Sequence, residues 1–127
     1  MSILEVKNVS KVFGSGHTSV KAVDDVSFSL DEGEVVLIMG PSGSRKTTLL
    51  SIIGGLMNPT SGEVLIREEN ITKLNENRLP HIRLQEIGFV FQAFNLLSNL
   101  SALDNVLLPM QEARMEQGRA RERAVEL

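Results

Sequence analysis

One short stretch of this chain has the residue types and spacing of a phosphate-binding loop. Positions 40 to 47 read Gly-Pro-Ser-Gly-Ser-Arg-Lys-Thr, against the pattern G-x-x-x-x-G-K-[ST]. Arg45 stands where the pattern has its second glycine. Lys46 has the position that reaches terminal phosphates, and Thr47 has the position whose hydroxyl ligates Mg²⁺. The stretch therefore predicts a site for a polyphosphate.

The segments on either side of this loop are those that such a site requires. Residues 35 to 39 are all apolar, which predicts a buried parallel strand, and residues 47 to 54 are compatible with a helix. A strand that leads through a turn into a helix directs backbone N–H groups and the positive end of the helix dipole at one spot. The alternative is a chance glycine-rich turn, which the order of strand, turn, Lys-Thr and helix disfavours.

Antiparallel strands are predicted in the N-terminal part of the chain. Residues 26 to 30 alternate apolar and polar side chains, and residues 14 to 16 form a Gly-Ser-Gly turn before them. Residues 63 to 66 resume as a strand after a turn cluster. Residues 87 to 91 are a second run that is apolar on both faces, and it ends at Gln92. This run predicts a second buried parallel strand.

The C-terminal part is predicted to be helical. Ser101 can cap a helix that has Asp104 in its first turn. We expect Pro109 to kink or end this helix, and Pro80 to interrupt a possible helix over 75–85. A further helix has an apolar stripe that begins with Ala120, Ala124 and Leu127.

Composition excludes several classes of protein. With 127 residues the chain holds one domain at most, and 42% hydrophobic and 23% charged residues are typical of a soluble globular protein. The net charge of -3, without a basic stripe, predicts no nucleic-acid partner. Cysteine is absent, so thiolate metal sites and disulfides are excluded. No signal peptide or bilayer-spanning run is visible, and His17 and His81 have no accompanying second metal ligand.

Several motifs together resemble the N-terminal half of an ATP-binding cassette (ABC) transporter nucleotide-binding domain, closest to the lipoprotein-release and macrolide-export type. Residues 11 to 14 resemble the family's A-loop region, with Phe13 in place of the usual tyrosine. Residues 40 to 48 are similar to its Walker A loop. Residues 87 to 92 are similar to the strand that ends in the Q-loop. The segment over 96–109 is similar to the part that approaches the membrane partner.

The resemblance implies an α/β fold: a P-loop NTPase (ABC ATPase) core with an N-terminal antiparallel β subdomain, here incomplete. Residues 1–127 would be the N-terminal part of one ATP-binding domain, truncated before the signature motif and Walker B. The implied cofactors are ATP and Mg²⁺, with the adenine stacked on Phe13 and the metal held by Thr47 and Gln92. The implied nucleotide-binding residues are Phe13, Gly40, Pro41, Ser42, Gly43, Ser44, Arg45, Lys46, Thr47, Thr48 and Gln92.

Partners and location are also implied by the resemblance. Intact relatives form homodimers that energise transport through a transmembrane permease subunit. The chain is therefore expected to be cytoplasmic and peripheral to the plasma (inner) membrane, without inserting into it. The permease selects the transported substrate, so the sequence does not identify it.

Departures from the family pattern predict that this chain has lost activity. Arginine at position 45 brings a Cβ and a long side chain to a point where glycine lets the backbone approach phosphate closely. The Leu-Ser-Gly-Gly-Gln signature, the Walker B aspartate, the catalytic glutamate and the switch histidine are absent from the 127 residues. No complete catalytic set is therefore expected: Lys46 would neutralise phosphate charge and Gln92 would be the Q-loop residue. We expect no ATP hydrolysis, at most weak MgATP binding, and exposed apolar surface on the two-sided runs.

Two other functions remain open at this point. One is a non-catalytic fragment that only binds a permease or a full-length homologue. The other is an unrelated small P-loop kinase or GTPase, which is disfavoured because no lid or guanine-specifying motif is present.

Two further substitutions depart from the family pattern. Glu68 stands where the family favours a turn glycine, and Pro80 stands where it favours a helix former.

Overall fold

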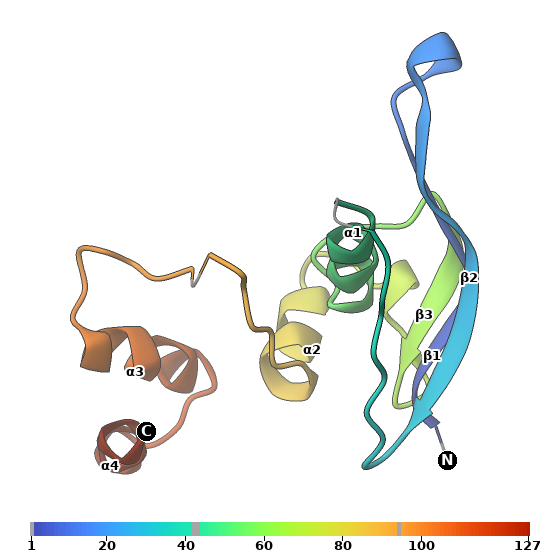
Figure 1. Ribbon diagram of the computed structural model, residues 1–127. Coiled ribbons are helices and arrows are strands. Elements are labelled where there is room, and N and C mark those ends of the chain that lie inside the picture. The colour runs from blue at the N-terminus through green and yellow to red at the C-terminus, as the bar shows by residue number, and fades with distance from the viewer. Residues whose placement is uncertain (1, 42–43, 94) are drawn as a thin grey trace. The chain divides into compact units, whose positions relative to one another are not determined.

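The computed structural model describes all residues except 1, 42, 43 and 94, and of Ser44 it describes only the backbone. Two compact units divide the chain, Met1–Ile82 and Arg83–Leu127. Each unit is considered by itself below. Figure 1 shows the elements of both.

The first unit is built on an antiparallel sheet, which within the described residues has four strands in the order β2-β1-β3-β4. The strands are β1 (Ser2–Phe13), β2 (Val20–Asp31), β3 (Ser61–Ile66) and β4 (Glu69–Asn70). The β1–β2 hairpin closes through a turn and the 3₁₀ helix η1 (Gly16–Thr18), and its tip extends beyond the other strands (Figure 1). The sheet confirms the predicted N-terminal antiparallel strands and the strand over 63–66.

Gly62 is required where the pairing of β1 with β3 is irregular. The pairing of these strands shifts between Lys7 and Ser10, where Asn8 adopts a positive φ of 49°. Gly62 itself has a φ of 91°, and a Cβ added there would collide with the Asn8 carbonyl oxygen. Asn8 is fixed in turn by β2, because its backbone N–H donates to the Ser27 hydroxyl at 2.8 Å. Only glycine both adopts this positive φ readily and leaves room for the Asn8 carbonyl group at position 62.

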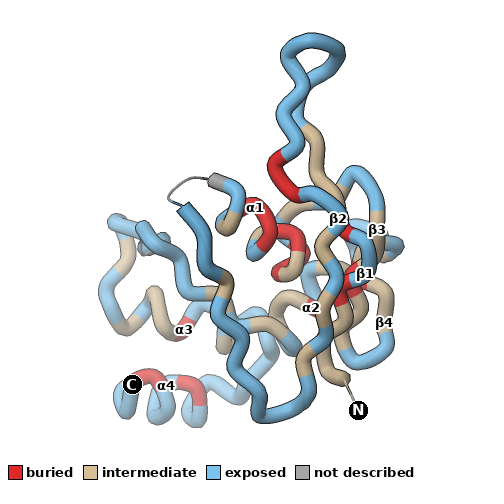
Figure 2. The backbone as a smooth tube through the Cα atoms, turned by 45° about the vertical axis from the view of Figure 1, so that its right-hand side comes forward, coloured by how far each residue is buried: buried red, intermediate tan, exposed pale blue. Residues whose placement is uncertain are grey.

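The helix α1 (Ser44–Ile53) packs on this sheet and forms the core with it. Ile52 on the helix is fully buried together with Val6, Val9 and Val64 of the strands. Figure 2 shows the buried part of α1 and of the sheet. Burying large aliphatic side chains of this kind stabilises a fold by about 1.5–3 kcal/mol each. The helix predicted over 47–54 is confirmed and begins earlier, at Ser44.

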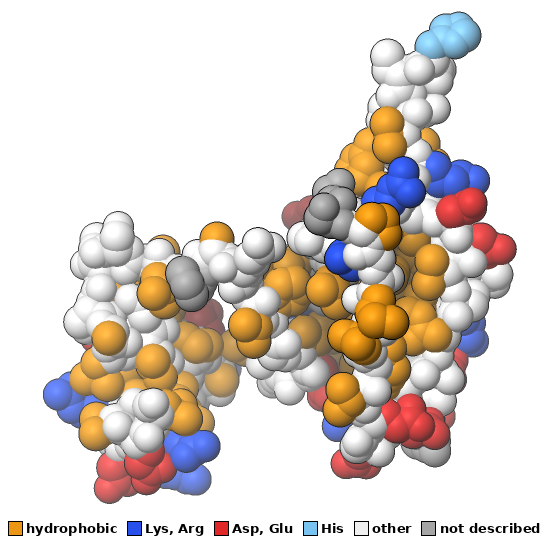
Figure 3. All heavy atoms as spheres, viewed as in Figure 1, with side chains coloured by type: hydrophobic (Ala, Val, Ile, Leu, Met, Phe, Trp, Pro, Cys, Tyr) orange, Lys and Arg blue, Asp and Glu red, His pale blue; other side chains and the backbone are white. Residues whose placement is uncertain are grey.

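The buried parallel strands predicted over 35–39 and 87–91 are not formed. Neither segment belongs to a strand among the residues that the structure describes. Val35, Leu37 and Met39 are 94%, 77% and 79% exposed, and Val90 is 96% exposed. A parallel strand exists only where neighbouring strands complete its ladder, and the sheet described here supplies none. The expectation that these runs would expose apolar surface is confirmed (Figure 3).

The first unit closes with η2 (Ile71–Lys73), and α2 (Leu79–Glu86) then leads from it into the second unit. The helix that was possible over 75–85 forms only from Leu79 onward, and Pro80 is its second residue instead of a break inside it. Proline is tolerated in a first helical turn, where its missing N–H would have had no acceptor within the helix. Pro80 therefore sets where α2 begins.

The second unit contains α3 (Ala102–Glu112) and α4 (Gln117–Glu126). Their shared core holds Leu107 together with Ala120 and Ala124 of the predicted stripe, whereas Leu127 is exposed against expectation because it lies beyond the end of α4. The predicted cap is confirmed, since the Asp104 N–H donates to the Ser101 hydroxyl at 3.1 Å. The helix continues past Pro109 to Glu112 instead of ending there.

Candidate functional site

The predicted phosphate loop leads directly into the first turn of α1. Gly40 and Pro41 are exposed before it, whereas Ser42 and Gly43 lie outside the described residues. The helix begins at Ser44. The first backbone N–H groups of any helix have no acceptor within it, and the helix dipole adds positive charge at that end. This arrangement favours an anion in front of α1.

Lys46 connects the two ends of the loop. Its Nζ donates a hydrogen bond to the Gly40 carbonyl oxygen at 2.8 Å. A Cβ added at Gly40 would have Lys46 Cδ as its nearest neighbour, at 3.9 Å, which is an ordinary contact distance. The backbone is therefore not crowded at Gly40. Within the described part of the loop the lysine ammonium donates to the neutral Gly40 carbonyl, which an anionic oxygen can replace with a stronger, charge-assisted bond.

The first turn of α1 presents two faces. Arg45 and Thr47 are exposed, so the arginine side chain and the threonine hydroxyl are accessible from solvent. Thr48 is buried, like Leu49 after it, and these residues fix the helix on the core. Arg45 thus adds its bulk and its charge to the exposed face of the predicted loop. Its Cβ is the feature that the usual glycine lacks.

Phe13, the predicted adenine platform, is the last residue of β1. Its side chain is 41% exposed, and its backbone pairs with Val20 across the hairpin. The Nζ of Lys11 lies over its ring, 5.3 Å from the ring centroid. Phe13 and the loop belong to the same unit. An exposed aromatic face of this kind is suited to stacking on a flat base.

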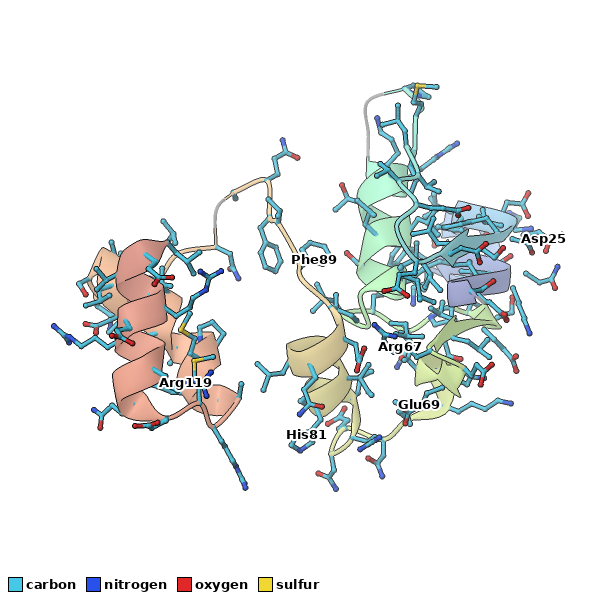
Figure 4. The ribbon with its side chains drawn as sticks, turned by 90° about the horizontal axis from the view of Figure 1, so that it is seen from below. Asp25, Arg67, Glu69, His81, Phe89 and Arg119 are labelled. Atoms are coloured by element: carbon cyan, nitrogen blue, oxygen red, sulfur yellow. The ribbon has the colours of Figure 1, made fainter. Side chains whose placement is uncertain are left out.

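Gln92, the predicted Q-loop residue, lies exposed in a turn of the second unit. It follows an apolar segment in which the rings of Phe89 and Phe91 lie 4.6 Å apart between centroids and 37° from coplanar (Figure 4). The predicted site residues are thus divided between the units. Phe13 and residues 40–48 belong to the first, and Gln92 belongs to the second.

A polar anchor that sequence reasoning missed holds the loop before α3. The Asn105 side chain accepts from the Leu97 N–H at 2.9 Å and donates to the Ser101 carbonyl at 2.8 Å. It also donates to the carbonyls of Leu97 and Leu100 at 3.2 and 3.3 Å. Leu96 and Leu97 of this loop are exposed. The available signal was a side-chain amide one turn beyond a capping serine.

Two searches of the described residues were negative. They contain no helix that is both long and apolar enough to cross a membrane. They also contain no group of three or more His, Cys, Asp or Glu side chains placed to hold a metal ion. His17 and His81 are exposed, as expected.

Comparison with known proteins gives consistent matches. The family model described as ABC transporter matches residues 23–126. An "Uncharacterized ABC transporter ATP-binding protein" of Thermotoga maritima is 46% identical over 125 residues, which are 98% of this chain and 53% of that protein. The "Macrolide export ATP-binding/permease protein MacB" of Aggregatibacter actinomycetemcomitans is 42% identical over 127 residues, which are 100% of this chain and 20% of that protein.

A solved structure is similar over the same extent. The ATP-binding cassette MJ0796, described as dimeric in a post-hydrolysis state with ADP and Pi bound, superposes with a TM-score of 0.89 at 44% identity. The match covers 97% of this chain and 54% of that one. The chain thus spans about half the length of this cassette and of the Thermotoga relative. The likeness confirms the predicted fold class, of which these residues hold an incomplete part.

Proposed function

This chain belongs to the ABC transporter family, and from that premise we propose that it is the N-terminal part, residues 1–127, of an ATP-binding transport subunit. The observation that carries the proposal is the start of α1 directly after the predicted loop, with the Lys46 ammonium 2.8 Å from the Gly40 carbonyl oxygen. Helix start, lysine and glycine turn are the parts that a phosphate site needs.

The residues of the first unit fit a nucleoside triphosphate in charge and chemistry. Backbone N–H groups at the start of α1 would donate hydrogen bonds to the phosphate oxygens, and Lys46 would neutralise their charge. Phe13 would stack on the adenine, and the exposed Thr47 hydroxyl would help hold Mg²⁺. When bound, Mg²⁺ supplies positive charge that offsets the charge of the terminal phosphates. The Arg45 side chain is the part that opposes a close fit.

We infer that these 127 residues by themselves do not hydrolyse ATP and bind it only weakly. Hydrolysis needs a group that orients or activates the attacking water. The catalytic glutamate and Walker B aspartate of the family are not among these residues. Arg45 replaces a glycine whose lack of Cβ permits close phosphate approach.

The proposed partner is a transmembrane permease subunit at the cytoplasmic side of the plasma (inner) membrane. Support comes from the MacB relative, whose name joins an ATP-binding part and a permease. A second copy of the cassette is the other proposed partner, since the similar solved cassette is dimeric. Leu96 and Leu97, exposed in the loop that Asn105 holds, are the proposed contact to the permease.

A thermal unfolding series with MgATP tests the proposal. We expect a small rise in Tm that needs millimolar nucleotide and is lost in Lys46→Ala, with no phosphate released in either protein. Saturation at a hundredfold excess over Kd would stabilise the fold by about 2.7 kcal/mol, a shift of several degrees. Phosphate release above the no-protein rate, or a Tm rise that Lys46→Ala does not change, would contradict it.

The alternative is a chain that binds a permease or a full-length homologue without using nucleotide. The exposed apolar side chains of Val35, Leu37 and Met39 favour it, because such surface is suited to contact with another protein. Co-expression with a permease separates the two functions. Co-purification that is unchanged by Lys46→Ala, together with no MgATP effect on Tm, would support the alternative.

A further inference from the structure

Lys11 makes two contacts that join the predicted adenine platform to the segment after α1. Its Nζ lies 5.3 Å from the centroid of the Phe13 ring and donates a hydrogen bond to the Asn58 carbonyl oxygen at 2.9 Å. A cation this close to an aromatic face is attracted by the ring quadrupole. The hydrogen bond fixes the ammonium, so the ammonium in turn restricts the ring.

The segment that Lys11 reaches is itself fastened to β1. The Thr60 N–H donates to the Ser10 carbonyl oxygen at 2.8 Å. The Val12 N–H donates to the Thr60 hydroxyl at 2.9 Å. With the Lys11 bond, three hydrogen bonds therefore tie the end of β1 to residues 58–60.

The two residues just before this segment are joined to the last turn of α1. The N–H groups of Leu56 and Met57 donate to the Ser51 carbonyl oxygen at 2.8 and 3.2 Å. A short run of hydrogen bonds thus leads from α1 to the end of β1 where Phe13 lies. The predicted phosphate site is at the start of α1. This connection therefore determines the distance between the Phe13 ring and phosphates bound there.

The Lys11 ammonium also determines on which face of the Phe13 ring a base can stack. Phe13 is 41% exposed, and the space over one face of its ring contains the Lys11 ammonium. A flat base can therefore stack only on the opposite face. An ammonium on one face of a ring leaves the other free for an aromatic partner.

We propose that Lys11 is a positioning residue for adenine nucleotides: it holds the Phe13 ring with one face covered and ties it to the segment after α1. The inference rests on the proposed function, because it assumes that Phe13 and the loop hold one nucleotide. Lys11 itself touches neither the phosphates nor the base in this account. Its loss should therefore weaken binding of a ligand with a base and leave a ligand of phosphates alone unchanged.

The test compares MgATP with magnesium tripolyphosphate, which has the phosphates without the base. The chain contains no Trp or Tyr, so Phe13→Trp introduces a single indole whose emission reports stacking at this position. Binding is measured by this emission, and by calorimetry with Phe13 retained. Both are carried out with arginine and with glycine at position 45.

We expect Lys11→Met to weaken MgATP binding three- to tenfold and to leave tripolyphosphate binding within twofold. Lys11→Arg keeps a cation over the ring and should restore most of the MgATP affinity. Lys7→Met is the matched control, because Lys7 is an exposed lysine of the same strand that pairs with Glu5 at 3.2 Å. It should change neither affinity.

Three results would overturn the inference. Equal MgATP affinity in Lys11→Met and the parent protein would show that Lys11 does not position the Phe13 ring for MgATP binding. Equal weakening of MgATP and tripolyphosphate would show a general loss of charge or structure. Absence of binding by either ligand, with arginine and with glycine at position 45, would instead refute the proposed function, and the inference with it.

Discussion

Glu68 has a backbone conformation that side chains rarely adopt. It follows β3 with a φ of 69°, directly after Arg67 with a φ of 47°. The left-handed region costs an ordinary residue about 1–2 kcal/mol relative to glycine. The resemblance had already placed a turn glycine at this position, so the structure supplies the physical reason for that preference.

Replacing Glu68 by glycine should therefore stabilise the first unit. We expect Glu68→Gly to raise the free energy of unfolding by up to about 1 kcal/mol, the relief of strain less the extra chain entropy that glycine loses on folding. That corresponds to several degrees in Tm by calorimetry. Glu76→Gly is the control, an exposed glutamate in a nearby turn whose φ is not positive. A lower Tm in Glu68→Gly than in Glu76→Gly would contradict the strain argument.

Single residues also show what the sequence could predict of the site. The Lys-Thr pair and the glycine turn predict a phosphate loop, because those residue types at nearly that spacing are typical of one. The hydrogen bond from Lys11 to Asn58 was not predictable, since it joins residues 47 positions apart. Such a contact depends on how β1 and α1 pack. Periodicity within either element contains no information about it.

At the scale of elements, local patterns predicted what local forces determine. Alternation over 26–30 indicated an antiparallel strand, and its partner β1 lies just before it in the chain. The run over 35–39 has an equally clear apolar pattern, yet it forms no strand among the described residues. Strand formation there depends on neighbours that these residues do not provide. An apolar run thus predicts that burial would stabilise a segment. Whether the segment is buried depends on neighbouring elements.

The exposed run over 35–39 should dominate the surface behaviour of the chain. We expect Leu37→Glu to reduce binding of a hydrophobic dye and light scattering, because Leu37 is 77% exposed and adds to a continuous apolar surface. Its unfolding free energy should change by less than about 0.5 kcal/mol. Ile52→Glu is the comparison, since it places a charge in the buried core and should unfold the unit. Unchanged dye binding in Leu37→Glu would show that this run is covered in solution.

Asn105 should determine the order of the loop before α3. Its side chain bonds to backbone groups of Leu97, Leu100 and Ser101. We expect Asn105→Ala to accelerate hydrogen exchange of the Leu97 amide about five- to tenfold, since one lost bond to a backbone group is worth about 1–1.5 kcal/mol. The control is Asn99→Ala, at an exposed position of the same loop. Equal exchange rates in the two variants would contradict the anchoring role.

At the scale of the whole molecule, the chain holds two compact units and spans about half the length of the similar cassette. The fold class was predictable because motifs at four separated places pointed to one family. The division into two units was not, since it follows from the packing of whole elements. The phosphate loop and Phe13 belong to the first unit, so nucleotide binding by that unit can be tested without reference to Gln92.

The central claim is that residues 40–48 form a phosphate cradle that Arg45 obstructs. Calorimetric titration with MgATP of the parent chain and of Arg45→Gly tests it most directly, with Lys46→Ala added to the glycine variant as the control. We predict that Arg45→Gly binds MgATP at least about tenfold more tightly than the parent, a gain of about 1.4 kcal/mol, and that Lys46→Ala abolishes the gain. Equal or weaker binding by a folded Arg45→Gly protein would contradict the account.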